Sequence, residues 1–174
     1  FSEHKDEGSI KFSCNWIKSS PLSMDKLIKI NSWRDKLYSL GLIGAYDNGI
    51  GFGNISSRSK NNTFIITGTA TGNIKKLNRN HYVQVNSYDF AKNSLTCDGP
   101  IKASSESLSH AIIYECSPKT RAVIHVHNLK LWKKLIDNMP TTDKKITYGS
   151  IEMVHEIRRL FRETDIENKK IIVM

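Results

Sequence analysis

Hydrophobic residues in one long stretch of the chain recur at three- and four-residue intervals. In "SMDKLIKINSWRDKLYSLG", residues 23–41, this spacing places the apolar side chains on one face of an amphipathic helix. Ser23 can cap the start of that helix and Gly41 can end it. We therefore predict a helix whose buried face consists of Met24, Leu27, Ile30, Trp33, Leu37 and Leu40.

Three later stretches alternate or are rich in β-branched residues, as strands are. They are "TFIIT" at 63–67, "HYVQVNSYD" at 81–89 and "NSLTC" at 93–97. Turn-forming residues such as Lys92 and Asn93 separate them. Short connections of this kind predict hairpins, and therefore antiparallel pairing.

The second half of the chain mixes helices with one further strand. Helices are predicted over about 104–115, over 129–137 and after Gly149, and the strand is "AVIHVH" at 122–127. In the last helix His155 falls on the polar face, opposite Met153, Ile157, Leu160 and Phe161.

These elements predict an α/β (α+β) fold, a three-layer domain in which helices cover a central, mostly antiparallel sheet. We assign this domain to residues 23–174 and expect residues 1–22, which are polar and show little periodicity, to form an extended N-terminal arm. Because the chain starts with Phe1 and ends in the strand-like "NKKIIVM", we expect it to be part of a longer protein, truncated at its C-terminus.

Composition excludes some classes of protein but does not identify a single class. With 174 residues and 39% apolar content, the chain can bury one core. Its net charge of +9 suits an anionic partner, but the lysines are scattered as pairs without an aromatic platform, so a nucleic-acid partner rests on charge alone. Three cysteines at unrelated spacings argue against a disulfide framework and favour a reducing, cytoplasmic location. No apolar run has the length of a membrane span.

The most specific chemical signal is "HVH", in which His125 and His127 flank Val126. In a strand, side chains two residues apart point to the same face, so both imidazoles can converge on one point. Two such histidines provide two of the three protein ligands that a catalytic zinc ion needs. A chance His-x-His is common enough that this pair alone does not establish a metal site.

Three further stretches can bind an anion or move a proton. In "GFGNISSR", Gly53 lets the backbone approach a ligand and Asn54 supplies an amide, although an ordinary turn would look the same. In "ITGTATG", Thr71 and Gly72 follow a strand and can contribute hydroxyl and N–H donors.

The third stretch is "KASSESLSH", at a predicted helix N-terminus. Unpaired N–H groups there favour a phosphate beside Ser104 and Ser105. Glu106 lies in the predicted first turn, where compensation of the helix dipole explains it equally well. His110, one turn later, is interpreted as structural, and so are the cysteines.

The order and spacing of "GNIS", "TATG", "SSE" and "HVH" resemble those of the class II aldolase/adducin family, over roughly residues 27–174. The resemblance implies a class II aldolase-like fold and a zinc-dependent aldol lyase that cleaves a small phosphorylated ketose through a zinc-stabilised enediolate. It implies that His125 and His127 bind Zn²⁺ and that Glu106 is the catalytic acid and base. The implied phosphate ligands are Gly53, Asn54, Thr71, Gly72, Ser104 and Ser105. A homotetramer is implied as well.

Two departures from the family pattern are visible. The third zinc histidine of the family would fall after Met174, outside this chain, and the segment that carries the family's proton-donating tyrosine is missing between "NMPTT" and "ITYGS". Tyr148 lies near that gap without matching the motif. A dehydratase or an epimerase on the same scaffold, or a non-catalytic module like the adducin head, therefore stay as alternatives.

Overall fold

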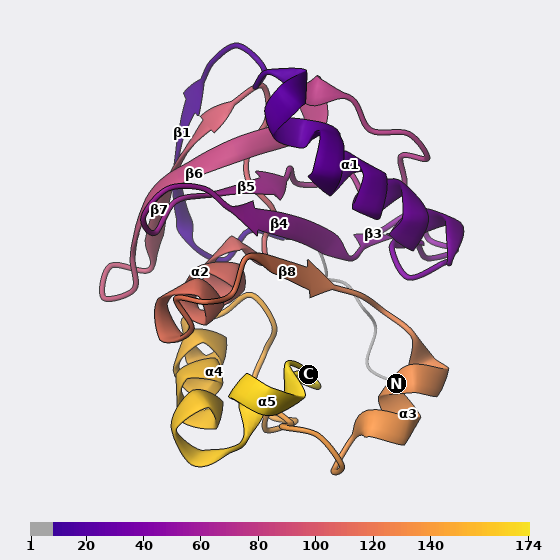
Figure 1. Ribbon diagram of the computed structural model, residues 1–174, viewed down its shortest axis with the longest axis vertical. Coiled ribbons are helices and arrows are strands. Elements are labelled where there is room, and N and C mark those ends of the chain that lie inside the picture. The colour runs from indigo at the N-terminus through magenta and orange to yellow at the C-terminus, as the bar shows by residue number, and fades with distance from the viewer. Residues whose placement is uncertain (1–8) are drawn as a thin grey trace.

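A mostly antiparallel sheet forms the centre of the molecule (Figure 1). The structure is a computed structural model and describes residues 9–174. Within these residues six strands lie in the order β1-β7-β6-β5-β4-β8, and only β1 and β7 run parallel. The strands are β1 (Ser13–Lys18), β4 (Asn54–Arg58), β5 (Phe64–Thr67), β6 (Tyr82–Asp89), β7 (Ser94–Gly99) and β8 (Ala122–His125).

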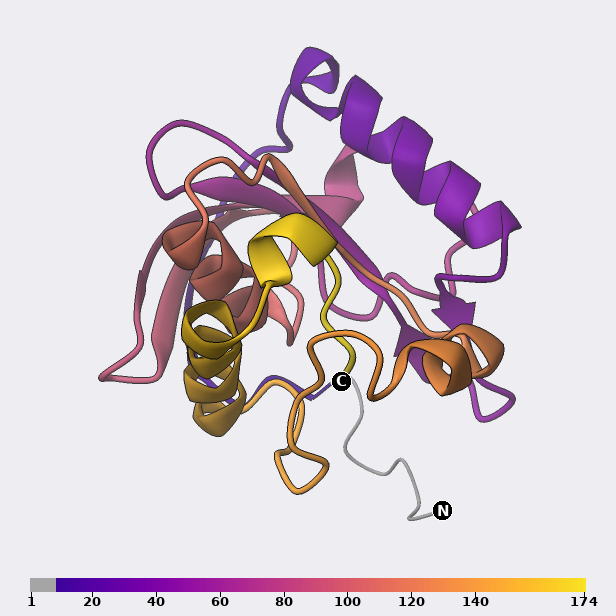
Figure 2. The same ribbon diagram turned by 60° about the horizontal axis from the view of Figure 1, so that its bottom comes forward.

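Helices cover both faces of this sheet (Figures 1 and 2). Helix α1 (Met24–Ser39) lies on one face, and α2 (Ser107–Cys116) with α4 (Ile151–Glu163) on the other. The remaining elements are β2 (Gly44–Ala45), β3 (Gly51–Phe52), the 3-10 turn η1 (Arg79–His81), α3 (Leu129–Leu135) and α5 (Ile166–Lys169). The predicted three-layer fold is thus confirmed.

Alternation along the strands divides the core into two clusters. In β5, Phe64 and Ile66 pack towards α2 and α4, whereas Ile65 packs towards α1. All three are at most 5% exposed, because helices cover both faces of this central strand.

The predicted buried face of α1 is partly wrong. Leu27, Ile30 and Leu37 are buried, but the structure exposes Met24, Trp33 and Leu40. Arg34 takes the central buried position, at 1% exposure. Its guanidinium donates to three backbone carbonyls of residues 71–75, which no apolar side chain could satisfy.

The ends of α1 follow the sequence more closely. Ser23 is the N-cap residue, although its side chain makes no capping hydrogen bond. At the other end Gly41 has φ +67° and donates to Tyr38 O, while Leu42 N donates to Leu37 O. This pair of bonds is the Schellman motif, in which glycine accepts the left-handed conformation without strain.

The two ends of the chain differ from expectation. Within the predicted arm, residues 13–18 form the edge strand β1, which pairs with β7, while residues 1–8 lie outside the described part. The domain boundary at residue 22 stays a prediction. Residues 171–174 form a single bridge, Val173 with Thr141, instead of a strand.

Candidate functional site

His125 and His127 lie with their rings side by side at the end of β8. Their Nε2 atoms are 2.8 Å apart, and their ring centroids 4.9 Å apart. The backbone N–H of His127, just beyond the strand, donates to Leu42 O at 3.1 Å. Val126 packs on the other side, into the cluster under α1. The two imidazoles therefore converge on one point, and their role as ligands stays a prediction.

The histidine pair fits a divalent metal ion as two of its ligands. Zinc bonds to imidazole nitrogen are about 2.0 Å long, so two ligands of a tetrahedral ion lie about 3.3 Å apart. The observed separation of 2.8 Å needs only a small opening. Burial lowers the pKa of His125 to about 4, which keeps its imidazole in the neutral form that binds metals. Over residues 9–174 no cluster of three His, Cys, Asp or Glu side chains completes a site.

The other ring nitrogen of His127 contacts a residue that the sequence did not reveal. Tyr46 Oη lies 2.6 Å from His127 Nδ1, and the Phe52 ring stacks on the imidazole at a centroid distance of 5.2 Å. Both aromatic residues belong to the small hairpin of β2 and β3. The available signal was Asn48-Gly49, a dipeptide typical of tight hairpins, between the two short strands.

Glu106 is a buried carboxyl group at the start of α2. The helix begins at Ser107, so Glu106 occupies the N-cap and not the first turn as predicted. Its side chain is 5% exposed, and Ser109 Oγ donates to Oε2 at 3.0 Å. Burial raises the pKa of Glu106, and the hydrogen bond from Ser109 opposes this shift. A raised pKa makes a carboxylate a stronger base, which suits a group that takes up and releases a proton.

His110 links α2 to β4 beneath the histidine pair. Its Nδ1 lies 2.7 Å from Ser56 Oγ, which in turn contacts Tyr114 Oη at 2.7 Å. Burial, followed by the nearby His125, lowers the pKa of His110 to about 3. His110 Nε2 is buried and has no hydrogen-bond partner within the described residues. The predicted structural role agrees with these contacts.

Gly53 and Asn54 lie directly beside the histidine pair. Asn54 is the register partner of His125 in the pairing of β4 with β8. Gly53 has φ +77°, and a Cβ there would come within 2.8 Å of Ile43 Cγ1. The Oδ1 of Asn54 is buried, and no hydrogen-bond partner for it is found in the described part of the chain. Close packing thus explains the glycine, whereas the unpartnered amide oxygen is compatible with a bound ligand.

The loop with Thr71 and Gly72 is held tightly by its surroundings. Thr71 Oγ1 donates to Gly68 O at 2.9 Å, and Arg34 Nη2 donates to both carbonyls, Thr71 O and Gly72 O. A Cβ at Gly72 would lie 2.6 Å from Gly44 O, so only glycine fits against the β2–β3 hairpin. Hydrogen bonds and close packing therefore hold this loop in place.

Ser104 and Ser105 lie next to that loop. Gly68 bridges to Ala103, and Thr69 N donates to Lys102 O at 2.9 Å. Ser104 Oγ accepts weakly from Glu106 N at 3.4 Å, and both serines are at most 7% exposed. The start of β4, the end of β8 and the residues after β5 thus lie at one end of the sheet, as the directions of β4 and β8 in Figure 1 show. Ser104, Ser105 and Glu106 follow Ala103, which bridges to Gly68 at this end.

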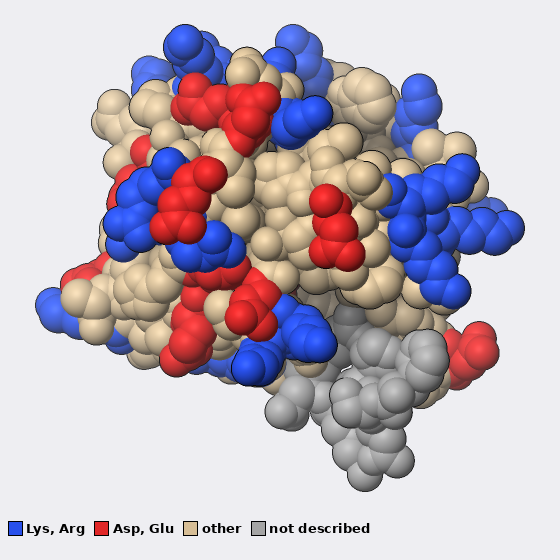
Figure 3. All heavy atoms as spheres, turned by 90° about the horizontal axis from the view of Figure 1, so that it is seen from below, with Lys and Arg blue, Asp and Glu red and all other residues tan. Residues whose placement is uncertain are grey.

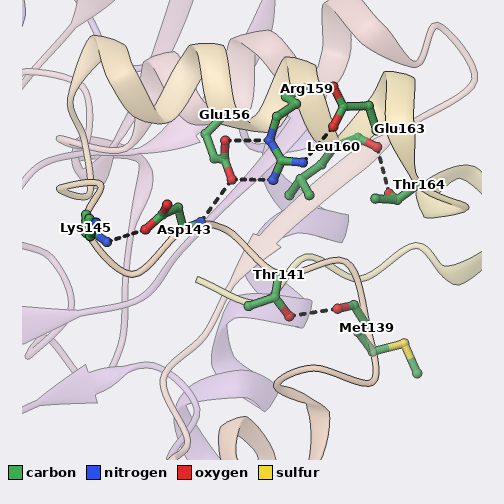
Figure 4. Close-up of polar contacts among 9 residues, drawn as sticks. All are labelled: Met139, Thr141, Asp143, Lys145, Glu156, Arg159, Leu160, Glu163 and Thr164. Atoms are coloured by element: carbon green, nitrogen blue, oxygen red, sulfur yellow. Dashed lines mark hydrogen bonds and ion pairs between the residues drawn. The ribbon is translucent and has the colours of Figure 1, made fainter.

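A surface groove elsewhere contains none of these residues. It is lined by residues 137–141 and by parts of 159–169. Within it Arg159 forms two hydrogen bonds with Glu156 and a third with Glu163 (Figure 4). Glu156 also accepts from Asp143 N at 2.9 Å. Because its guanidinium already has two carboxylate partners, Arg159 is poorly suited to bind an anionic ligand there.

Two other sequence features can be placed in the structure. Burial raises the pKa of the Cys97 thiol to about 12, so it is a poor nucleophile, and its Sγ lies 3.8 Å from Cys14 Sγ. Basic side chains gather on the right of the face shown in Figure 3. Helix α3 carries three exposed lysines, Lys130, Lys133 and Lys134. None of the helices formed by residues 9–174 is long and apolar enough to cross a membrane.

Comparison with known proteins supports the fold and the family. The chain is similar to YgbL of Escherichia coli and of Klebsiella pneumoniae, whose proposed activities are aldolase, epimerase or decarboxylase. The Escherichia coli structure has a TM-score of 0.57 and 14% identity, over 79% of this chain and 70% of that one. The Klebsiella pneumoniae structure has a TM-score of 0.57 and 15% identity, over 83% and 74%. At these identities the likeness shows the fold alone.

A comparison with curated protein sequences gave no match. The sequence model of the class II aldolase and adducin N-terminal domain, however, matches residues 44–165, which is more than half of the chain. That region contains every residue of the predicted site. The chain belongs to the class II aldolase and adducin N-terminal domain family.

Proposed function

We propose that the chain is a metal-dependent aldol lyase that cleaves a small phosphorylated ketose. The observation that carries this proposal is the convergence of His125 Nε2 and His127 Nε2, 2.8 Å apart, at the end of the sheet that also carries buried, polar side chains of β4 and α2. Family membership supports aldolase chemistry at the level of the class.

His125 and His127 would hold the metal ion, Zn²⁺ by our proposal, and a third protein ligand would follow Met174. Such an ion, when bound, supplies a Lewis acid that polarises a carbonyl oxygen of the substrate. Both imidazoles are well placed for this role. Val126 packs against the core, and the two rings therefore lie together on the opposite side of the chain.

Glu106 would move the proton during carbon–carbon bond cleavage. Burial raises the pKa of this carboxyl group, which strengthens it as a base that takes a proton from a substrate hydroxyl and then returns one to carbon. Ser109 orients the carboxyl group by donating to Oε2. The buried position of Glu106 also keeps bulk water away from the proton that it holds.

The phosphate of the substrate would bind beside this carboxyl group. The proposed donors are Ser104 and Ser105 before α2, Thr71 and Gly72 in the adjoining loop, and Gly53 with the Asn54 amide from β4. Since Arg34 and the β2–β3 hairpin already fix the loop, binding would require little reordering of the backbone. The basic charge of the chain, +9, would attract such an anion.

The same site is also compatible with two related reactions and with a non-catalytic role. A dehydratase or an epimerase would use the same metal, phosphate and proton-transfer groups, and a non-catalytic module would keep only their outline. We further propose a cytoplasmic homotetramer. Identification of the product separates these alternatives, because only an aldol lyase releases two carbonyl fragments.

The test is to incubate the zinc-loaded protein with a panel of phosphorylated ketoses and to identify products by mass spectrometry. The expected result is a pair of smaller carbonyl products, with turnover reduced by about 10²- to 10⁴-fold in Glu106→Gln while zinc and phosphate still bind. Ser87→Ala, an exposed position on β6, is the matched control and should retain full turnover. Unchanged turnover in Glu106→Gln would show that Glu106 does not transfer the proton. An isomerised or dehydrated product would show that the protein is an epimerase or a dehydratase and not an aldol lyase.

A further inference from the structure

The hydroxyl of Tyr46 touches a ring nitrogen of one proposed metal ligand. Tyr46 Oη lies 2.6 Å from Nδ1 of His127, and His127 Nε2 lies 2.8 Å from His125 Nε2. We infer that Tyr46 is a positioning residue, which fixes the orientation and the tautomer of His127 so that Nε2 is presented to the metal. This inference rests on the proposed metal site.

The two nitrogens of an imidazole point in different directions, so Tyr46 stands behind His127 as seen from the proposed metal. A metal bound to Nε2 requires the proton of the neutral ring to be on Nδ1. In that state His127 Nδ1–H donates to the phenol oxygen of Tyr46. Such a partner fixes the ring and makes the ligand nitrogen more basic. Tyr46 therefore acts through His127 and does not touch substrate.

A second side chain restricts the same ring. Phe52 stacks on the imidazole of His127 with an interplanar angle of 25°, and Tyr46 packs on Phe52 at a centroid distance of 4.7 Å. Rotation of the imidazole about its χ2 angle would break both the stacking and the hydrogen bond. Stacking and the hydrogen bond thus hold the imidazole of His127 in one orientation. Less conformational entropy of this side chain is therefore lost when a metal binds.

The hairpin that carries both aromatic residues is itself well fixed. Tyr46 N donates to Ile50 O at 2.9 Å, and Gly49 N donates to Tyr46 O at 2.8 Å. A Cβ at Gly44 would lie 3.1 Å from Phe52 Cζ, so glycine leaves the room that the ring occupies. On the far side, Gly72 packs against the backbone of the hairpin. Tyr46 is therefore preorganised, as a group that orients a ligand must be.

The experiment compares metal binding by the unaltered protein, extended past Met174, with Tyr46→Phe and His127→Ala. Phenylalanine keeps the packing against Phe52 and removes only the hydroxyl. Titration with Co²⁺ reports both affinity and, through its visible absorption spectrum, ligand geometry. We expect Tyr46→Phe to weaken Co²⁺ and Zn²⁺ binding by about 10- to 100-fold and to change the Co²⁺ spectrum.

Tyr88→Phe is the matched control, because the Tyr88 hydroxyl is buried on β6 and has no hydrogen-bond partner among the residues that the structure describes. It should leave affinity and spectrum unchanged, and thermal unfolding should be similar for both variants. Equal affinity and an identical spectrum in Tyr46→Phe, with binding lost in His127→Ala, would overturn the positioning role and leave the metal site intact. Failure of the unaltered protein to bind either metal would overturn both proposals.

Discussion

Arg34 of α1 donates from Nη2 to the backbone carbonyl of Thr71 at 2.9 Å, and this contact joins the first helix to the proposed anion loop. The same guanidinium also donates to Gly72 O and Lys75 O. It is 1% exposed, and burial lowers its pKa. Arginine side chains stay charged in proteins. The buried guanidinium of Arg34 thus supplies hydrogen-bond donors to the backbone carbonyls of a loop that lies outside the regular strands and helices.

Replacing Arg34 with methionine should destabilise the protein strongly. Three carbonyls would lose a charged donor, and of these Thr71 O would keep only its hydrogen bond from Ile74 N. A buried carbonyl left without a partner, such as Gly72 O, costs about 1–3 kcal/mol. We expect the free energy of unfolding in urea to fall by about 3 kcal/mol or more. Arg79→Met, at an exposed position in η1, should change it by less than about 0.5 kcal/mol. Equal effects of the two substitutions would show that the carbonyl contacts do not stabilise the fold.

Much of the fold was predictable because periodicity reports which faces are buried. The helix at 24–39 and the hairpin of β6 and β7 follow from it directly. The same reasoning chose Trp33 and missed Arg34, since apolar spacing contains no information about carbonyls in a loop some 41 residues away. The parallel partner of β1 was missed for a similar reason, because β7 lies far along the chain.

The histidine pair was predictable from local geometry, whereas its surroundings were not. Alternation alone puts His125 and His127 on one face. The strands β2 and β3 have only two residues each, too few for alternation to be recognised. The contact of Tyr46 with His127 joins residues 81 positions apart, and it depends on how the hairpin packs against the end of β8.

Ser105 is expected to contribute to phosphate binding. It lies before α2 at 7% exposure, beside the loop that contains Thr71. Because a hydrogen bond to a charged group contributes about 1.5–3 kcal/mol, Ser105→Ala should weaken the binding of inorganic phosphate about tenfold or more. Isothermal titration calorimetry measures this affinity, with the exposed Ser87→Ala as control. A phosphate affinity equal to that of the control would place the anion elsewhere.

His110 should make the protein less stable in mild acid. Its pKa falls from 6.5 to about 3 on folding, so between these values the unfolded state binds a proton that the folded state does not. The free energy of unfolding therefore decreases as the pH falls below about 6.5, by up to about 1.4 kcal/mol per pH unit. His125, whose pKa burial lowers to about 4, adds an effect of the same sign.

Urea unfolding of metal-free protein between pH 7 and about 4.5 measures this dependence. His110→Gln should give a shallower decline than the unaltered protein, because glutamine does not titrate. His155→Gln removes an exposed histidine of α4 and should retain the full slope. If His110→Gln and the unaltered protein lose stability in parallel, the acid sensitivity does not come from His110.

Zinc stoichiometry tests the central claim, that His125 and His127 bind a metal ion, most directly. It is measured by elemental analysis on this chain and on one extended past Met174, with His125→Ala as the control. The proposal predicts about one zinc ion per extended chain and its loss in His125→Ala. No bound zinc in either length of chain, even after incubation with the metal, would contradict the proposal and favour a module that binds without metal chemistry.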